Sequence, residues 1–172
     1  NYTVSSLSTL VNALFVSGGP STSGTLRRIQ LKRQGKTVVE FDMYDFLMKG
    51  DKTKDVRLQP EDVIFVPPAG PMAAVIGQVA TPAIYEMNEE TTITGLLGMA
   101  GGVSAAGYTK KIQVERIFEN ETKVIIDKNL RELTDEDDII LADGDIVAIY
   151  PISDTIVNAV TLSGNVVRPG QY

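Results

Sequence analysis

The chain has 172 residues and a formal net charge of −6; 43% of its residues are hydrophobic and 22% are charged. This composition is typical of a folded globular protein, and the acidic balance argues against a nucleic-acid binder, which needs a basic face. Cysteine and histidine are absent, which excludes disulfides, thiolate metal sites and the serine–histidine–aspartate triad. Any catalysis would therefore depend on Asp, Glu, Lys or Tyr.

No apolar run approaches the length of about 20 residues that a membrane-spanning helix needs, so we expect no membrane span. The chain starts at Asn1 without methionine and stops at Tyr172 within a strand–turn pattern. We therefore expect it to be a piece of a longer protein, with any membrane anchor or signal peptide outside it.

The N-terminal part of the chain predicts a helix followed by β-strands. A Ser8 or Thr9 cap opens the helix, and the Gly18-Gly19 pair ends it. The elements that we expect next are a hairpin over residues 29–41, a short helical or irregular piece over 43–48 and a strand over 63–66.

The middle of the chain predicts two strands before its helix. The expected elements are strands over residues 73–79 and 83–87, a helix ending at Gly101-Gly102, a hairpin over 112–127 and a strand over 146–150. The order is β-β-α-β-β, a short helical or irregular piece, and β. It predicts an α+β fold in which a mixed sheet packs on a helix, the β-grasp arrangement.

The sequence also repeats itself at an offset of about 83 residues. The matching blocks are residues 9–11 with 92–94, 18–19 with 101–102, 27–33 with 110–116, 58–63 with 141–146, and 76–85 with 163–172. The blocks occur in the same order in both copies, which chance does not explain. The repeat predicts a unit of about 80 residues that is able to fold by itself.

We therefore place three units on the chain. Residues 1–68 form a first unit without its opening strand, residues 72–151 form a complete second unit, and residues 155–172 form the opening β-hairpin of a third. Residues 67–71 and 151–155 are the expected seams, where Pro and Gly stiffen and expose the connection.

Two basic pairs occupy the same place in the two copies. Arg27-Arg28 and Lys110-Lys111 both open the strand that follows the Gly loop. Such pairs can bind carboxylates or phosphates of an acidic polymer, and these four residues are the candidate polymer-binding site. The alternative is that each pair is only a solvated strand end.

Other chemical motifs favour structural interpretations. Residues 19–25 space two glycines like a phosphate loop, but the required Lys is missing and the loop follows a helix. The acidic run 135–138 lacks the ligand spacing of a calcium loop, so we expect a solvated loop and no metal site. Asp62 and Asp145 each precede an apolar strand, and we expect their carboxylates to bind turn N–H groups.

The repeat resembles the SLBB (soluble-ligand-binding β-grasp) family. Residues 164–172, Gly-Asn-Val-Val-Arg-Pro-Gly-Gln-Tyr, are similar to its opening signature. Ala100-Gly101-Gly102 resembles the cap of its helix, and Gly144-Asp145 resembles the turn before its last strand. The first copy departs from this pattern at Ser17, Glu61 and residues 80–83.

Tandem SLBB units are similar to the periplasmic part of bacterial outer-membrane proteins that export capsular or extracellular polysaccharide. The resemblance implies a non-enzymatic, cofactor-free module at the periplasmic face of the outer membrane. It also implies three partners: an acidic or neutral polysaccharide, further copies in a homo-oligomeric ring, and an inner-membrane synthesis or co-polymerase complex.

A second hypothesis is a soluble module that binds a small ligand or a sugar. It requires a concave apolar pocket with a few converging polar groups. Enzymatic cleavage of the polymer is the least favoured hypothesis, since the sequence has no histidine and no acidic pair recurs in both copies.

Overall fold

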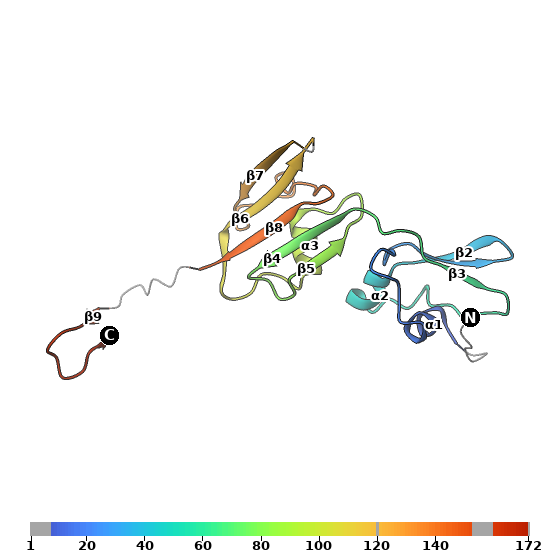
Figure 1. The fold of residues 1–172 in the computed structure, drawn as a ribbon, viewed down its shortest axis with the longest axis horizontal. Coiled ribbons are helices and arrows are strands. Elements are labelled where there is room, and N and C mark those ends of the chain that lie inside the picture. The colour runs from blue at the N-terminus through green and yellow to red at the C-terminus, as the bar shows by residue number, and fades with distance from the viewer. Residues whose placement is uncertain (1–7, 120, 153–159, 172) are drawn as a thin grey trace.

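The computed structural model describes residues 8–119, 121–152 and 160–171. Within these ranges the fold is α+β, with three helices, two larger sheets and one small two-stranded sheet (Figure 1). None of the helices described there is both long and apolar enough to cross a membrane.

The first larger sheet has the strand order β2-β1-β3, and β1 is antiparallel to both neighbours. The elements of this part are α1 (Leu10–Val16), β1 (Ile29–Arg33), β2 (Lys36–Phe41), α2 (Met43–Lys49) and β3 (Val63–Phe65). One face of α1 packs Leu10, Val11 and Leu14 against Ile29 and Leu31 of the central strand. This part therefore has a hydrophobic core of its own.

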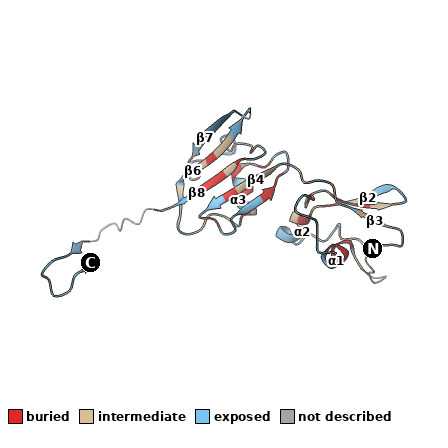
Figure 2. Ribbon diagram, in the orientation of Figure 1, coloured by how far each residue is buried: buried red, intermediate tan, exposed pale blue. Residues whose placement is uncertain are grey.

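The second larger sheet has the order β5-β4-β8-β6-β7. Its elements are β4 (Met72–Gly77), β5 (Ala83–Glu86), α3 (Ile93–Met99), β6 (Gly107–Phe118), β7 (Thr122–Lys128) and β8 (Ile146–Pro151). Strands β4 and β8 are parallel while the other pairs are antiparallel, so the sheet is mixed as predicted. The buried residues concentrate on its central strands and on α3, whereas β7 is largely exposed (Figure 2).

The two sheets share a pattern of connection. The order β2-β1-β3 corresponds element by element to β7-β6-β8, with antiparallel pairing throughout. The main difference lies at one edge: β8 has β4 as its second neighbour, whereas β3 has no second neighbour among the described residues. The first larger sheet thus has a free edge in the part of the chain that the structure describes.

Local signals in the sequence explain the helix boundaries. The side chains of Thr9 and Thr92 accept hydrogen bonds from first-turn N–H groups of α1 and α3. Gly18 and Gly101 follow these helices with positive φ angles of 86° and 78°, which glycine adopts without steric cost. Residues 129–133 form turns and not a helix, which fits the irregular alternative of the sequence analysis.

The last described segment is a small hairpin of β9 (Thr161–Leu162) and β10 (Gly170–Gln171). Its pairs, Leu162 with Gly170 and Thr161 with Gln171, are antiparallel. Of the predicted third-unit hairpin, residues 155–159 and Tyr172 lie outside the described residues.

Candidate functional site

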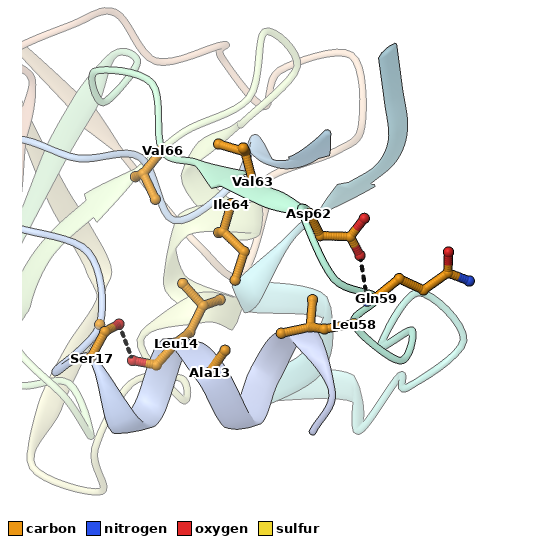
Figure 3. A pocket seen from close by; sticks show the side chains of 10 residues that line it. Ala13, Leu14, Ser17, Leu58, Gln59, Asp62, Val63, Ile64 and Val66 are labelled. Carbon is orange, nitrogen blue, oxygen red and sulfur yellow. Dashed lines mark hydrogen bonds between the residues drawn. The ribbon is translucent and has the colours of Figure 1, made fainter. Parts of the chain in front are cut away.

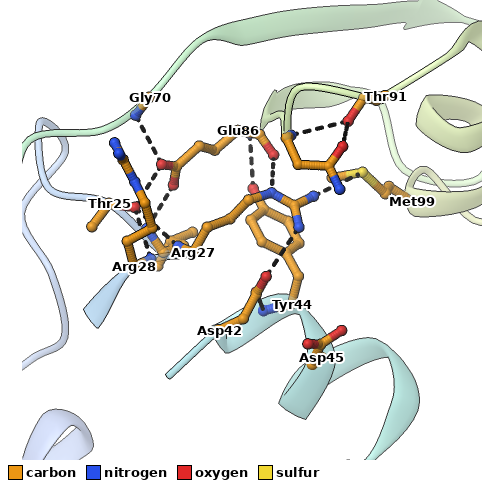
Figure 4. A network of polar contacts seen from close by, with 12 residues as sticks. Thr25, Arg27, Arg28, Asp42, Tyr44, Asp45, Gly70, Glu86, Thr91 and Met99 are labelled. Carbon is orange, nitrogen blue, oxygen red and sulfur yellow. Dashed lines mark hydrogen bonds and ion pairs between the residues drawn. The ribbon is translucent and has the colours of Figure 1, made fainter. Parts of the chain in front are cut away.

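The carboxylate of Glu86, at the end of β5, lies at the seam between the two larger sheets (Figure 4). Its Oε1 accepts hydrogen bonds from the Thr25 hydroxyl at 2.6 Å and from the Gly70 N–H at 2.8 Å. Its Oε2 accepts from the Leu26 N–H at 2.7 Å. The residue is only 5% exposed, so these bonds replace the water that the charge loses.

Arg27 crosses the same seam from the opposite direction. Its Nε donates to the Glu86 carbonyl at 2.7 Å, and its Nη1 pairs with Asp42 at 3.1 Å. The guanidinium carbon lies 4.4 Å from the centre of the Tyr44 ring, and Nη2 lies 3.3 Å from the Met99 sulfur. The Tyr44 hydroxyl accepts from the Glu86 N–H at 3.0 Å. Polar groups of both sheets are thus tied together in one network.

The network shifts two pKa values. Burial tends to raise the pKa of Glu86, but the hydrogen bonds from Thr25, Gly70 and Leu26 outweigh it and hold the pKa below its usual range. Burial raises the pKa of the Tyr44 hydroxyl above its usual value. Both groups therefore keep their ordinary charge state at neutral pH, Glu86 ionised and Tyr44 neutral.

The four candidate polymer-binding residues have different environments. Arg27 is enclosed in the seam, with a side chain that is only 14% exposed. Arg28 is exposed beside a cavity of about 260 Å³ that Gly70 and Glu86 also line. Lys110 is exposed on β6, and Lys111 beside it pairs with Asp127 at 3.0 Å. Among the described interactions, no hydrogen bond or ion pair links the arginine pair to the lysine pair.

A second polar arrangement occurs once in each larger sheet. Arg33 donates to both carboxylate oxygens of Asp62 at 2.8 and 2.9 Å, and Arg116 donates to those of Asp145 at distances between 2.6 and 3.1 Å. Each aspartate side chain is nearly inaccessible, and the two partners are 29 residues apart in both cases.

Sequence reasoning found these aspartates but missed their arginine partners. The turn role is confirmed, because Asp62 accepts from the Gln59 N–H and Asp145 from the Ala142 N–H, both at 2.8 Å. The missed signal was the arginine that ends both copies of the repeated block 27–33 and 110–116. The acidic run is exposed as expected except for Asp138, which accepts hydrogen bonds from the backbone and hydroxyl of Thr94 in the first turn of α3.

The largest cavity described lies between α1 and β3 and has a volume of about 500 Å³ (Figure 3). Its walls are about equally polar and apolar: Leu14, Ile64 and Val66 contribute apolar surface, and Ser17 and Gln59 contribute polar surface. Asp62 lines it as well, but its carboxylate is already bound to Arg33 and to the Gln59 N–H. The described residues contain no group of three or more acidic side chains that could hold a metal ion.

Comparison with known families gives a match over the second larger sheet. Residues 72–127 match the SLBB domain. This SLBB segment runs from the start of β4 into β7 and includes Glu86 of the seam. SLBB is a family of binding domains and is found in polysaccharide export proteins. No curated protein matches the chain.

Proposed function

We propose that the chain is a non-catalytic structural module of a bacterial polysaccharide export protein, built from repeated SLBB units. The proposal rests mainly on the similarity of the two larger sheets. The strand order β2-β1-β3 in the first corresponds to β7-β6-β8 in the second, and each sheet has an Arg–Asp pair at the same place. The SLBB match covers β4 to β7 of the second larger sheet. The sequence repeat extends the SLBB assignment to the first larger sheet.

The seam supports a structural role. A ring or channel wall has to keep successive units in a constant orientation. The bonds of Glu86 and Arg27 join the two larger sheets through charge-assisted contacts in a mostly buried setting, where such contacts are stronger than at the surface. In this proposal Arg27 mainly stabilises the contact between the two larger sheets and does not bind polymer.

The proposed setting is the periplasm, at the inner face of the outer membrane. There the module contributes to a homo-oligomeric ring that receives polymer from an inner-membrane synthesis or co-polymerase complex. In this proposal Arg28, Lys110 and Lys111 contact an acidic polysaccharide, and Lys111 exchanges its exposed contact with Asp127 for the polymer.

The test replaces these three cations together by glutamine in the complete export protein. Each exposed ion contact contributes only up to about 1 kcal/mol, so all three cations are removed together. We expect export of an acidic polysaccharide to fall about threefold or more. The measurement is the amount of extracellular polymer per cell, together with the amount of folded protein in the envelope. The loss of export should be smaller for a polysaccharide of low charge, because the contact is electrostatic.

The matched control replaces Lys36, Lys52 and Lys54 by glutamine. These lysines are exposed and carry the same total charge, but they lie outside the repeated basic position. Equal export by both triple variants would contradict a polymer-binding role of the repeated cations and leave them as solvated strand ends.

A further inference from the structure

We infer that strand β7 pairs antiparallel with β7 of a second copy of this chain, so that two five-stranded sheets join edge to edge about a twofold axis at Ile125. Both copies use the same surface, so the contact is isologous and joins two copies. It is separate from the heterologous contacts that build a ring, and it does not depend on polysaccharide export.

β7 is an edge strand in the middle of the chain. It pairs with β6 along all seven of its residues, and among the described residues no strand pairs with its other side. The equivalent strand of the first larger sheet, β2, is also an edge there, although the whole second sheet follows it. The first sheet precedes β7 in turn and does not cover it. Neither a preceding nor a following unit of the repeat therefore occupies this position.

The edge of β7 is regular and partly apolar. Its register with β6 is unbroken from Thr122 to Lys128, and Val124 and Ile125 are 42% and 54% exposed. In β2, by contrast, the register with β1 shifts and leaves Val38 without a partner. Such bulges protect an edge from added strands. β7 has no bulge, so its free backbone groups can accept another strand.

The charges of β7 make this edge complementary to itself. Lys123 and Asp127 lie two residues on either side of Ile125, so the three side chains share one face of the sheet. Neighbours on β6 hold both charges: Lys123 donates to Glu115 at 2.7 Å, and Asp127 pairs with Lys111 at 3.0 Å. The side chains of Lys123 and Asp127 are still 56% and 51% exposed, so each can take a second partner.

Antiparallel pairing about Ile125 uses this symmetry. It places Lys123 of each copy opposite Asp127 of the other, and Ile125 opposite its own counterpart. On the other face of the sheet, Val124 lies opposite Ile126. Opposite charges and branched apolar side chains at directly opposed positions stabilise antiparallel strands.

Moving the axis by one residue loses this match. With the axis at Val124, Glu121 would lie opposite Asp127, and like charges at opposed positions destabilise the pairing. With the axis at Ile126, Lys123 would lie opposite Asn129, beyond the end of the strand, and no ion pair would form. The sequence of β7 therefore favours one register.

Charge reversal in mixed samples tests the contact. Lys123→Asp places acidic groups opposite each other at both positions, and Asp127→Lys does the same with basic groups. Each variant alone should therefore associate at least about tenfold more weakly than the parent chain in analytical ultracentrifugation, because two attractions become two repulsions. In an equimolar mixture opposite charges meet again at both positions, and we expect the association of the parent chain to return.

The mixture contains its own control for folding. The changed contacts with Glu115 and Lys111 within each chain are the same in the separate and the mixed samples, so only contact between copies can restore association. Both variants keep a negative net charge, so overall attraction between unlike chains does not explain a recovery. A mixture that associates no more strongly than the separate variants would overturn the inference, as would a parent chain that stays monomeric.

A cysteine at the axis tests the register without changing a charge. The chain has no cysteine of its own, and opposed residues of antiparallel strands have Cα atoms about 4.5–5.5 Å apart, within the range of a disulfide. We expect Ile125→Cys to form disulfide-linked dimers on mild oxidation. Val38→Cys is the matched control, because Val38 is 47% exposed on the equivalent strand β2, and it should form few.

Equal dimer yields from the two cysteine variants would overturn the inference, because random collision would then account for the crosslinks. The export test leaves Lys123, Ile125 and Asp127 unchanged, so the two proposals can fail separately.

Discussion

Two side-chain pairs, Arg33 with Asp62 and Arg116 with Asp145, explain how a carboxylate can be buried at the start of an apolar strand. Each aspartate binds a guanidinium with both oxygens and also accepts a turn N–H. The pair therefore connects the tight turn to β1 in the first larger sheet and to β6 in the second. Arginine suits this place because its planar fork matches both carboxylate oxygens, which lysine cannot do.

Asp145→Asn tests this role at the residue scale. The substitution keeps the shape but removes the charge, so Arg116 loses its charged partner and keeps its hydrogen bond to the Ile140 carbonyl. We expect the free energy of unfolding to fall by about 1.5–3 kcal/mol, the range for hydrogen bonds to charged groups. The measurement is chemical denaturation at neutral pH, and Asp62→Asn should likewise lower the stability of the part of the chain that contains the first larger sheet.

The control for both variants is Asp135→Asn in the exposed acidic run. An exposed aspartate of this kind should change stability by less than about 0.5 kcal/mol. If Asp145→Asn were as harmless as the control, the pair would contribute orientation without net stability.

At the scale of elements, strand β4 determines how the second sheet closes. It pairs with β5 on one side and runs parallel to β8 on the other. At Gly77 the backbone turns with a positive φ directly against the Ile149 carbonyl. This close approach permits the hydrogen bond from the Gln78 N–H to that carbonyl at 2.9 Å.

Gly77→Ala should therefore be strongly destabilising. The added methyl carbon would lie 2.0 Å from the Ile149 oxygen, and the left-handed φ is unfavourable for alanine. We expect a loss of at least about 2 kcal/mol in the free energy of unfolding, because strain of 1–3 kcal/mol adds to the displacement of β8. Thermal unfolding followed by circular dichroism measures it.

Gly98→Ala in α3 is the matched control. A Cβ there meets nothing within 4 Å, and its φ is not in the left-handed region. Alanine should stabilise this helix by about 0.5–1 kcal/mol, because glycine loses more entropy on folding. Equal effects of the two substitutions would contradict the close approach at Gly77.

For the whole molecule, the seam around Glu86 makes stability depend on pH. The folded pKa of Glu86 is lowered from the ordinary value of 4.5. A lowered pKa means that its stabilising contribution is fully present above pH 4.5 and is lost as the pH falls through the folded pKa. Protonation would also turn one acceptor oxygen into a donor facing the donors Thr25, Leu26 and Gly70.

Glu86→Gln isolates this contribution. At neutral pH we expect a loss of about 2–3 kcal/mol in the free energy of unfolding, because an amide replaces a buried, hydrogen-bonded carboxylate. Below pH 4 the difference from the parent chain should shrink, since the parent also loses its charge. Denaturant titrations across this pH range measure both effects.

The neighbouring Glu89→Gln is the control, because Glu89 is exposed and no hydrogen bond or ion pair is described for it. It should behave like the parent chain at every pH. A difference between Glu86→Gln and the parent that stayed constant down to pH 3 would show that the carboxylate charge is not what stabilises the seam.

The sequence by itself determined the local structure of this protein. Helical spacing, hydroxyl caps and Gly-Gly pairs predicted α1 and α3, and apolar, β-branched runs predicted the strands of an α+β mixed sheet. These signals are readable because they act between residues a few positions apart. The self-similarity of the sequence also identified Asp62 and Asp145 as equivalent positions.

Only the tertiary structure decided which distant groups meet. Thr25 and Glu86 are 61 residues apart, and the partners of each Arg–Asp pair are 29 residues apart. No pattern among neighbouring residues predicts contacts over such separations. Arg27 and Arg28 are adjacent and look equivalent in the sequence, yet one is enclosed in the seam and the other is exposed. The reason is physical: burial and charge pairing depend on how the sheets pack, and packing is a property of the folded chain as a whole.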